Sequence, residues 1–230
     1  MSTERKLFRF LHFRTDLGDG LRTGVFFHTC AHSCTRFCLP NRFIREHAFG
    51  SDPLEAMFYN EEELIRYLKE EKVWCYTKKL GISFMGCEPL ADPRFCYRVA
   101  CGVKESGMDL QIHTCAAVSE TGFDMLYGVA DLFIINLFSA VDFGNKPFPE
   151  YSSRGVMERI WYLDERGFPY RLRIPVLRGI NEKQSIVLSD FVSKLKCLKS
   201  VILDFSLSDL TEEEKAEYRY PFQKRDVILY

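Results

Sequence analysis

The sequence lacks any apolar run that could cross a lipid bilayer, which takes about 20 consecutive apolar residues. Its opening residues, 1–6, lead into mixed polar and aromatic residues and do not resemble the core of a signal peptide. It also lacks an excess of charge, because 31 Lys and Arg residues face 32 Asp and Glu residues and the formal net charge is −1. Such a balance gives no electrostatic footprint for nucleic acid or for an anionic membrane. We therefore predict a cytoplasmic protein that binds neither.

The composition is that of a globular domain. Hydrophobic residues make up 47% of the 230 residues and charged residues 27%, which excludes a disordered chain. No linker, internal repeat or low-complexity segment interrupts the sequence. We expect a single domain over residues 1–230, with a cysteine-bearing loop at 28–41 and a C-terminal tail at 208–230.

Nine cysteines without a secretory signal indicate reduced thiols and metal ligation rather than disulfides. Three of them, Cys30, Cys34 and Cys38, follow the short apolar run 24–27 with the spacing C-x3-C-x3-C. Three thiolates from one loop can hold three irons of a [4Fe–4S] cube and leave the fourth iron open. An open iron is a place where a small chelating cofactor can bind.

Two other interpretations of the three cysteines remain open at this point. On a helix they would share one face as core residues, but the outer two would then lie about 12 Å apart and could not share a cluster. Thr29, Ser33 and Thr35 are poor helix formers and argue against that helix. A structural zinc site would need a fourth ligand, which His28 or His32 could supply.

Apolar runs and helical patterns alternate along the rest of the chain. A helix is expected to begin at Asn60 with Glu63 completing its cap, and Trp74 and Trp161 are expected in the core. The segment 42–60 has no clear period and suggests a loop with a short helix. The expected strands are 7–13, 24–27, 81–87, 109–115, 131–138, 170–177 and 200–206. The expected helices after the one at Asn60 are 92–106, 119–128, 153–166, 183–198 and, in the tail, 211–217.

Strands that alternate with helices predict an α/β fold with parallel strands and right-handed crossovers. Six such units could form an open doubly wound sheet or a partial (β/α)6 TIM-like barrel. The barrel is favoured because unusual residues gather at the carboxyl ends of the expected strands, where such barrels carry their sites. These residues are the three cysteines, Cys87-Glu88-Pro89, His113, Asn136 and Ser206.

Four stretches together resemble one family, the radical S-adenosylmethionine (SAM) enzymes that activate glycyl-radical enzymes. Residues 18–27 resemble the Asp-Gly-Pro-Gly-Ile-Arg-Thr segment that precedes the cluster loop of that family. The cysteines stand where its C-x3-C-x2-C ligands belong, and 82–90 is similar to its Thr-Phe-Ser-Gly-Gly-Glu-Pro-Leu. Residues 173–181 resemble its Arg-Ile-Pro-Val-Ile-Pro-Gly-Val-Asn. The four stretches occur in the family's order and cover most of residues 7–207.

The resemblance implies a mechanism and its partners. Cys30, Cys34 and Cys38 would ligate a [4Fe–4S] cluster, whose open iron chelates SAM; an electron from the cluster then breaks a carbon–sulfur bond. The resulting 5′-deoxyadenosyl radical would take a hydrogen atom from a glycine of a glycyl-radical enzyme. A flavodoxin or ferredoxin would donate the electron, and the protein would be a monomer. The residues expected to bind SAM are Gly86, Cys87, Glu88, Pro89, His113, Asn136 and Arg173.

The sequence also departs from the family pattern. The gap before Cys38 has one residue more, so that loop must bulge. Cys87 replaces a glycine, which would cost roughly 1–2 kcal/mol if the position needs a positive φ. The family has Asp-Thr-Asn-Gly where residues 113–116 read His-Thr-Cys-Ala, Asp-x-Lys at 136–138, and Leu-Pro-Tyr/Phe-His at 203–206.

Two functional interpretations follow. The chain is either a divergent active enzyme, with His113 or Arg173 replacing lost cofactor contacts, or a cluster-bearing paralogue that binds or regulates a partner without catalysis. The intact cysteine triplet and Glu88 favour the active enzyme. Arg22 is expected to pair with a carboxylate near the cluster or to lie at the partner surface.

Overall fold

The computed structural model describes residues 5–28, 56–75, 79–141, 152–206 and 208–230. The chain divides into two compact units. The first comprises Met1–Thr114 and Val118–Asp131, and the second comprises Cys115–Ala117 and Leu132–Tyr230.

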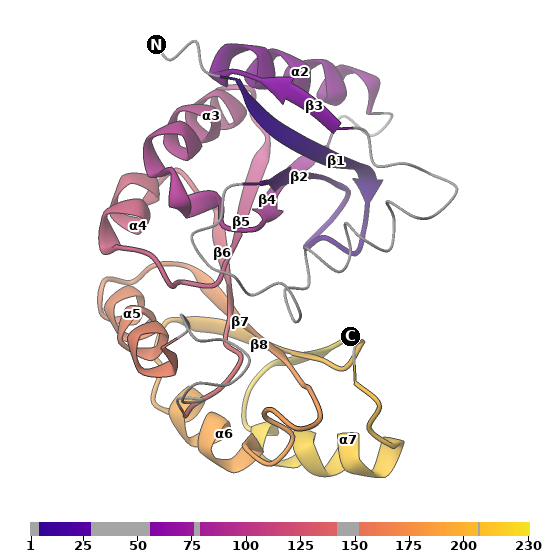
Figure 1. The fold of residues 1–230 in the computed structure, drawn as a ribbon, viewed down its shortest axis with the longest axis vertical. Helices are drawn as coiled ribbons and strands as arrows, with labels where there is room; N and C mark the ends of the chain where they lie inside the picture. The colour runs from indigo at the N-terminus through magenta and orange to yellow at the C-terminus, as the bar shows by residue number, and fades with distance from the viewer. Residues whose placement is uncertain (1–4, 29–55, 76–78, 142–151, 207) are drawn as a thin grey trace. The chain divides into compact units, whose positions relative to one another are not determined.

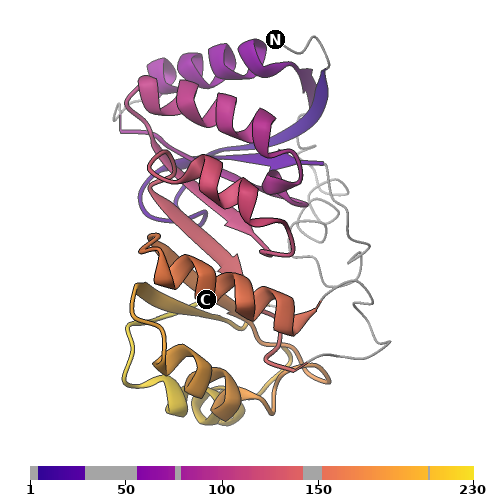
Figure 2. The same ribbon diagram turned by 90° about the vertical axis from the view of Figure 1, so that its left-hand side faces the viewer.

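The first unit contains a sheet in the order β3-β1-β2-β4-β5. Strand β1 pairs antiparallel with β2 and β3, whereas β2, β4 and β5 run parallel. The helices of this unit lie along one side of the sheet, as Figures 1 and 2 show. The elements are β1 (Lys6–Arg14), β2 (Arg22–Phe27), β3 (Ala56–Tyr59), α2 (Glu61–Trp74), β4 (Gly81–Gly86), η1 (Pro89–Ala91), α3 (Pro93–Glu105), β5 (Asp109–Thr114) and α4 (Glu120–Leu126).

Alternation along β1 places apolar side chains on both faces of this sheet. Phe10 lies 4.8 Å from the ring of Tyr67 in α2, and Phe8 stacks on Phe95 of α3 at 5.7 Å. These two residues therefore face the helices, and Arg9 and Leu11, at the alternate positions, face the other way. On that opposite face a second cluster of buried residues forms from Leu11, Leu17, Phe26 and Met85. Burial on both faces explains why every residue of β2 and β4 is buried.

Helix α2 begins as predicted. Asn60 caps it, and its side chain accepts a hydrogen bond from the backbone of Glu63, whose own side chain returns one to Asn60. Leu64 and Leu68 are fully buried, as the apolar face required. The prediction that Trp74 belongs to the core is wrong, because it is the last residue of α2 and 80% exposed.

Strand β3 corrects the prediction of a loop with a short helix over 42–60. Residues 56–59 pair antiparallel with β1, with Phe58 opposite Leu7. A four-residue edge strand is stabilised by its partner, so the local sequence pattern does not reveal it. Residues 42–55 lie outside the described part of the chain.

The second unit contains a parallel sheet in the order β6-β7-β8-β9. Helices α5 and α6 lie on one side of it (Figures 1 and 2). Its elements are β6 (Leu132–Asn136), α5 (Ser153–Glu165), β7 (Tyr170–Pro175), α6 (Ser185–Ser193), β8 (Leu198–Asp204), α7 (Glu212–Arg219), η2 (Tyr220–Phe222) and β9 (Val227–Leu229).

A buried carboxylate fixes β7 against helix α5. Asp164 of α5 accepts hydrogen bonds from the Tyr170 hydroxyl at 2.6 Å and from the backbone amides of Lys196 and Cys197. Burial works to raise the pKa of Asp164, but these hydrogen bonds outweigh it and hold that pKa below its usual value. Burial, followed by the bond to Asp164, raises the pKa of Tyr170. Tyr170 therefore faces the helices.

The C-terminal tail contains more structure than its acidic helix. Helix α7 is present, with Thr211 and Glu214 forming a capping box; Tyr218 of this helix and Phe222 of η2 are buried. Strand β9 was not predicted. It covers the edge of β8, with Val227 paired to Val201. Three residues at the end of a chain give too short a pattern to read.

The predicted alternation is confirmed, since β2, β4, β5, β6, β7 and β8 are the six expected parallel strands. The six cysteines within the described residues are free thiols. A search of the described residues finds no helix with the length and apolar character that a membrane crossing demands.

Candidate functional site

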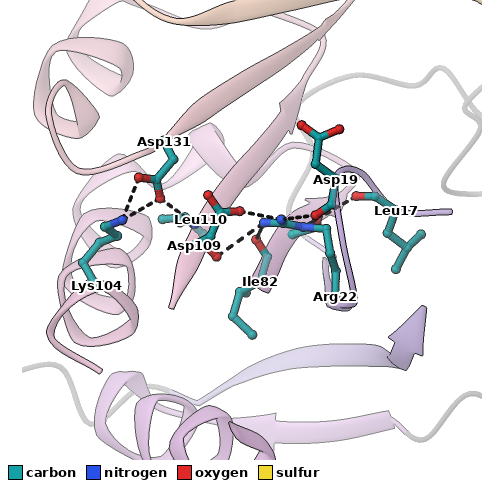
Figure 3. A network of polar contacts seen from close by, with 9 residues as sticks. Leu17, Asp19, Arg22, Ile82, Lys104, Asp109, Leu110 and Asp131 are labelled. Atoms are coloured by element: carbon teal, nitrogen blue, oxygen red, sulfur yellow. Dashed lines mark hydrogen bonds and ion pairs between the residues drawn. The ribbon is translucent and has the colours of Figure 1, made fainter. Parts of the chain in front are cut away.

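The glycine-rich turn before β2 leads into a buried arginine. Arg22 is 1% exposed, and its guanidinium donates to the Ser83 hydroxyl at 2.7 Å, to the Ile82 carbonyl at 2.6 Å and to the Asp19 carbonyl at 2.9 Å. It also forms an ion pair with Asp109, and Figure 3 shows the contacts of Arg22 with Asp19, Ile82 and Asp109. Burial lowers the pKa of Arg22, although the nearby Asp109 opposes the shift.

This network ties together the amino ends of three strands. Arg22 and Gly81 are the first residues of β2 and β4 and lie in register, and Asp109 begins β5. A side chain on Gly81 would place its Cβ 2.6 Å from the Arg22 Nη1 atom, so the close fit requires glycine there. Arg22 thus pairs with a carboxylate as expected, but at the end of β2 opposite to the cysteine loop. Its expected place at a partner surface is wrong, because it is buried.

At the other end of the same strands, β4 closes tightly on β2. Gly86 has a φ of +106°, and a Cβ there would lie 2.4 Å from the Phe27 carbonyl oxygen. The next amide, that of Cys87, donates to the same carbonyl at 2.9 Å. The left-handed backbone is therefore at Gly86. Cys87 is not among the non-glycine residues with positive φ, so the expected strain does not arise there.

Glu88 follows directly and is held inside the protein. It is 1% exposed, and its carboxylate accepts hydrogen bonds from the Leu90 amide at 3.1 Å and from the Thr114 hydroxyl at 2.9 Å. The first of these caps η1, which begins at Pro89. Because Thr114 ends β5, Glu88 joins the carboxyl ends of β4 and β5. Glu88 also helps to keep the neighbouring Cys96 neutral, since burial and then this carboxylate raise the pKa of that thiol.

Two histidines lie near these strand ends. His113 is the penultimate residue of β5 and is 9% exposed. It precedes Thr114, the residue that binds Glu88. His28 follows β2 and is half-buried; burial, with help from the charge of Arg9, lowers its pKa. Ala116, two residues after β5, has a φ of +54°.

The expected cluster ligands Cys30, Cys34 and Cys38, with His32, lie outside the described residues. Within the described ranges, no group of three or more His, Cys, Asp and Glu side chains could hold a metal ion.

In the second unit, polar residues end neighbouring strands on one face. Asn136, the last residue of β6, lies in register with Arg173 of β7. Arg173 is three residues from Tyr170, so its side chain points away from the helices. It donates through Nε and Nη2 to one carboxylate oxygen of Asp204, at 3.0 and 2.6 Å. Asp204 ends β8 and is 2% exposed.

Asp204 is the residue of this group that the sequence analysis missed. Comparison with the family pattern over 203–206 directed attention to Ser206 instead. The available signal was an acidic residue at the end of an otherwise apolar strand, because a carboxylate in that position needs a cationic partner.

A buried amide holds the loops that follow β6 and β7. Asn181 is fully buried, and its side chain donates to the carbonyls of Phe138 and Pro175 and accepts from the Leu177 amide, each at 2.8 Å. Asn181, the last residue of the motif 173–181, therefore stabilises the chain where β6 and β7 end.

Comparison with known sequences identifies the first half of the chain. Residues 17–127 match the family model described as a 4Fe-4S single cluster domain. The trans-4-hydroxy-L-proline dehydratase activating enzyme of Clostridioides difficile is 22% identical over 61% of this chain, but the match spans only 47% of that relative. The pyruvate formate-lyase-activating enzyme of Clostridium pasteurianum is 22% identical over 88% of this chain and 83% of its own.

Solved structures share the fold. A domain of a pyruvate-formate lyase-activating enzyme from Bacteroides vulgatus superimposes with a TM-score of 0.60 at 20% identity, over 65% of this chain and 98% of that one. SuiB of Streptococcus suis, solved with S-adenosylmethionine, gives 0.57 at 16% identity, over 75% of this chain and 43% of that one. The predicted α/β class with mostly parallel strands is therefore confirmed, and these solved structures share it. The resemblance read from the four motifs is confirmed: residues 17–127 match a 4Fe-4S single cluster domain, and the chain is similar to proteins named as activating enzymes of pyruvate formate-lyase and of a dehydratase.

Proposed function

We propose that this protein is a radical SAM enzyme that activates a glycyl-radical enzyme. Cys30, Cys34 and Cys38 would hold the [4Fe–4S] cluster, and SAM would bind at its open iron. One observation carries the proposal: the Cys87 amide donates to the carbonyl of Phe27, three residues before the first cysteine. The Glu88 segment is thereby fixed to the strand end from which the cysteine loop starts.

The described residues of the first unit fit the amino group of SAM. When bound, the cluster and SAM supply one-electron cleavage of a carbon–sulfur bond and a carbon-centred radical that can remove a hydrogen atom. Glu88 would accept the ammonium group, because its carboxylate is held at the carboxyl ends of β4 and β5 and an ionised carboxylate forms strong hydrogen bonds with an ammonium group. Its burial would keep this contact away from water and strengthen it. Gly86 and Pro89 would shape the backbone on either side.

Three further side chains are proposed to contact SAM. His113 would do so from β5, and Asn136 and Arg173 from the carboxyl half of β6 and β7. The amide of Asn136 can both donate to and accept from hydroxyl groups, whereas the guanidinium of Arg173 donates to carboxylates.

The partner is proposed from the relatives. Both are named as activating enzymes, one for pyruvate formate-lyase and one for a dehydratase. We infer that a glycine of a glycyl-radical enzyme is the substrate, that a flavodoxin or ferredoxin donates the electron, and that the protein acts as a monomer.

The test is anaerobic. The protein is reconstituted with iron and sulfide, reduced with dithionite and mixed with SAM, and the EPR spectrum and 5′-deoxyadenosine are then measured. We expect a [4Fe–4S]⁺ signal that shifts on addition of SAM, with 5′-deoxyadenosine formed. Cys34→Ala should lose the cluster, and Glu88→Gln should keep the cluster but weaken the shift.

The possible results separate the interpretations. A cluster without a shift or product would refute the enzyme and support the paralogue that binds a partner. Failure to assemble any cluster would refute the assignment of the three cysteines. If 5′-deoxyadenosine forms, a glycyl-radical EPR signal in a co-incubated candidate partner tests the activating role itself.

A further inference from the structure

The ion pair between Arg173 and Asp204 has an asymmetric geometry. Asp204 uses one oxygen for both Nε and Nη2 of Arg173, and its other oxygen accepts from the Ser206 amide at 3.0 Å. The carboxylate is 1% exposed in its side chain, whereas Arg173 keeps 24% of its side-chain exposure. Both oxygens of Asp204 are therefore hydrogen-bonded and the side chain is buried, whereas part of the Arg173 side chain remains exposed to solvent.

The part of Arg173 that remains available has a defined shape. Nε and Nη2 lie on the lateral edge of the guanidinium, and Asp204 occupies that edge. Both N–H groups of Nη1 and the second N–H of Nη2 then remain, and one N–H of Nη1 points the same way as that of Nη2, in one plane. Two parallel N–H groups match the two oxygens of a carboxylate.

The position of the pair along the strands agrees with a binding role. Arg173 lies opposite Ile202 of β8, yet its side chain leans two residues further to reach Asp204 at the end of that strand. Asn136, its register partner on β6, is also a strand-terminal residue. Below them on the same face lies an apolar cluster of Leu132, Ile134 and Ile202. Asn136, Arg173 and Asp204 thus lie next to an apolar surface, at the carboxyl end of the sheet, where α/β folds bind ligands.

We propose that Asp204 is a positioning residue, which holds the guanidinium of Arg173 so that its free pair of N–H groups binds the carboxylate of SAM. This inference rests on the proposed function and deepens it. Asp204 reaches the cofactor only through Arg173. A substitution at Asp204 should therefore act on the carboxylate contact and on no other part of SAM.

Asp204→Asn is a sharp perturbation because it keeps the shape of the side chain. Asparagine has one acceptor oxygen, so it cannot serve both the Ser206 amide and Arg173, and its amide group would face a donor. Arg173 would then lose its fixed orientation while keeping its charge. Arg173→Lys is the complementary change, since it keeps the charge and removes the planar pair of donors. Asp209→Asn is the matched control, because Asp209 pairs with Arg178 in an exposed position of the same unit.

The measurement is binding to the reconstituted protein with its cluster oxidised, so that SAM is not consumed. Equilibrium dialysis gives the dissociation constants of SAM and of decarboxylated SAM, which lacks only the carboxylate. We expect Asp204→Asn and Arg173→Lys each to weaken SAM binding about tenfold, roughly the share of one charge-assisted contact. Decarboxylated SAM should be affected less than twofold, and the double variant should bind SAM no worse than twofold below either single one.

The outcomes separate this inference from the function on which it rests. If the wild type binds SAM and Asp204→Asn binds it equally well, the positioning role is wrong while the proposed function stands. Equal losses for SAM and decarboxylated SAM would show general damage to the unit and would also overturn the role. Failure of the wild-type protein to bind SAM would overturn both. The Asp209→Asn control should match the wild type in every measurement.

Discussion

The buried arginine at the start of β2 offers the most direct test of the fold. Arg22→Ala removes donors from two buried acceptors, the Ile82 carbonyl and the Ser83 hydroxyl. Each bond from a charged donor to a buried group contributes about 1.5–3 kcal/mol. The loss at Asp109 should be small, because its side chain is 49% exposed and water can replace the arginine. Relief from burying the charge offsets part of the sum, so we expect a loss of about 3 kcal/mol.

Urea denaturation followed by circular dichroism measures this loss. In a thermal melt the same change should lower the midpoint by about 6–12 °C for a chain of this size. Arg22→Lys should lose less, about 2 kcal/mol, because an ammonium keeps the charge but cannot span three strands. The control is Arg14→Ala, whose partner Asp16 and own side chain are both nearly half exposed, and it should change stability by less than about 0.5 kcal/mol. If Arg22→Ala resembles that control, the network in Figure 3 does not hold the strand ends.

Two further predictions concern Gly86 and Asp164. Gly86→Ala should lower the free energy of unfolding by more than about 3 kcal/mol, because it adds a collision with Phe27 to an unfavourable φ. The control Gly128→Ala, at a φ of +75° with no atom within 4 Å, should lower it by only about 1 kcal/mol. Similar urea midpoints for the two variants would contradict this prediction. The folded-state pKa of Asp164 lies below its usual 3.8, so its stabilising contribution is present above that pH and is lost as the pH falls through the folded value. The stability difference between wild type and Asp164→Asn, measured in urea from pH 7 to pH 3, should therefore shrink below about pH 4, and a constant difference would refute this reasoning.

The alternation of strands and helices could be predicted from sequence because burial of the strands on both faces leaves a clear pattern. Runs such as 132–136 and 81–86 consist almost wholly of apolar residues, and helices with caps separate them. β3 and β9 gave no such signal, since each is a short edge strand stabilised by pairing with a neighbour distant in sequence. The prediction for Trp74 failed for a related reason. Its large apolar side chain suggested the core, but Trp74 is the last residue of α2, and the local pattern does not show where that helix ends.

The candidate site was predictable where a motif is continuous along the chain. Residues 86–89 lie together because they are consecutive, and the backbone conformation confirms that one glycine, Gly86, is needed. The Arg173–Asp204 pair joins residues 31 positions apart, and no local pattern links them. The carboxylate partner of Arg22 was expected, but its position was misjudged, because the six-residue strand from Arg22 to Phe27 separates it from the cysteine loop.

That separation explains how the first unit can combine a rigid frame with an adaptable site. At the amino ends of β2, β4 and β5, the charge of Arg22 is enclosed and its donors are spent on strand carbonyls and Ser83, so this end gains stability and little capacity to bind. At the carboxyl ends, the close approach of Gly86 to Phe27 uses backbone atoms alone, and the buried Glu88 carboxylate accepts hydrogen bonds from Leu90 and Thr114. The side chains of residues 113–116 take no part in that backbone contact, so they can change without loosening it. This arrangement accounts for a chain that retains the Gly-x-Glu-Pro segment while its neighbouring polar residues differ from the family pattern.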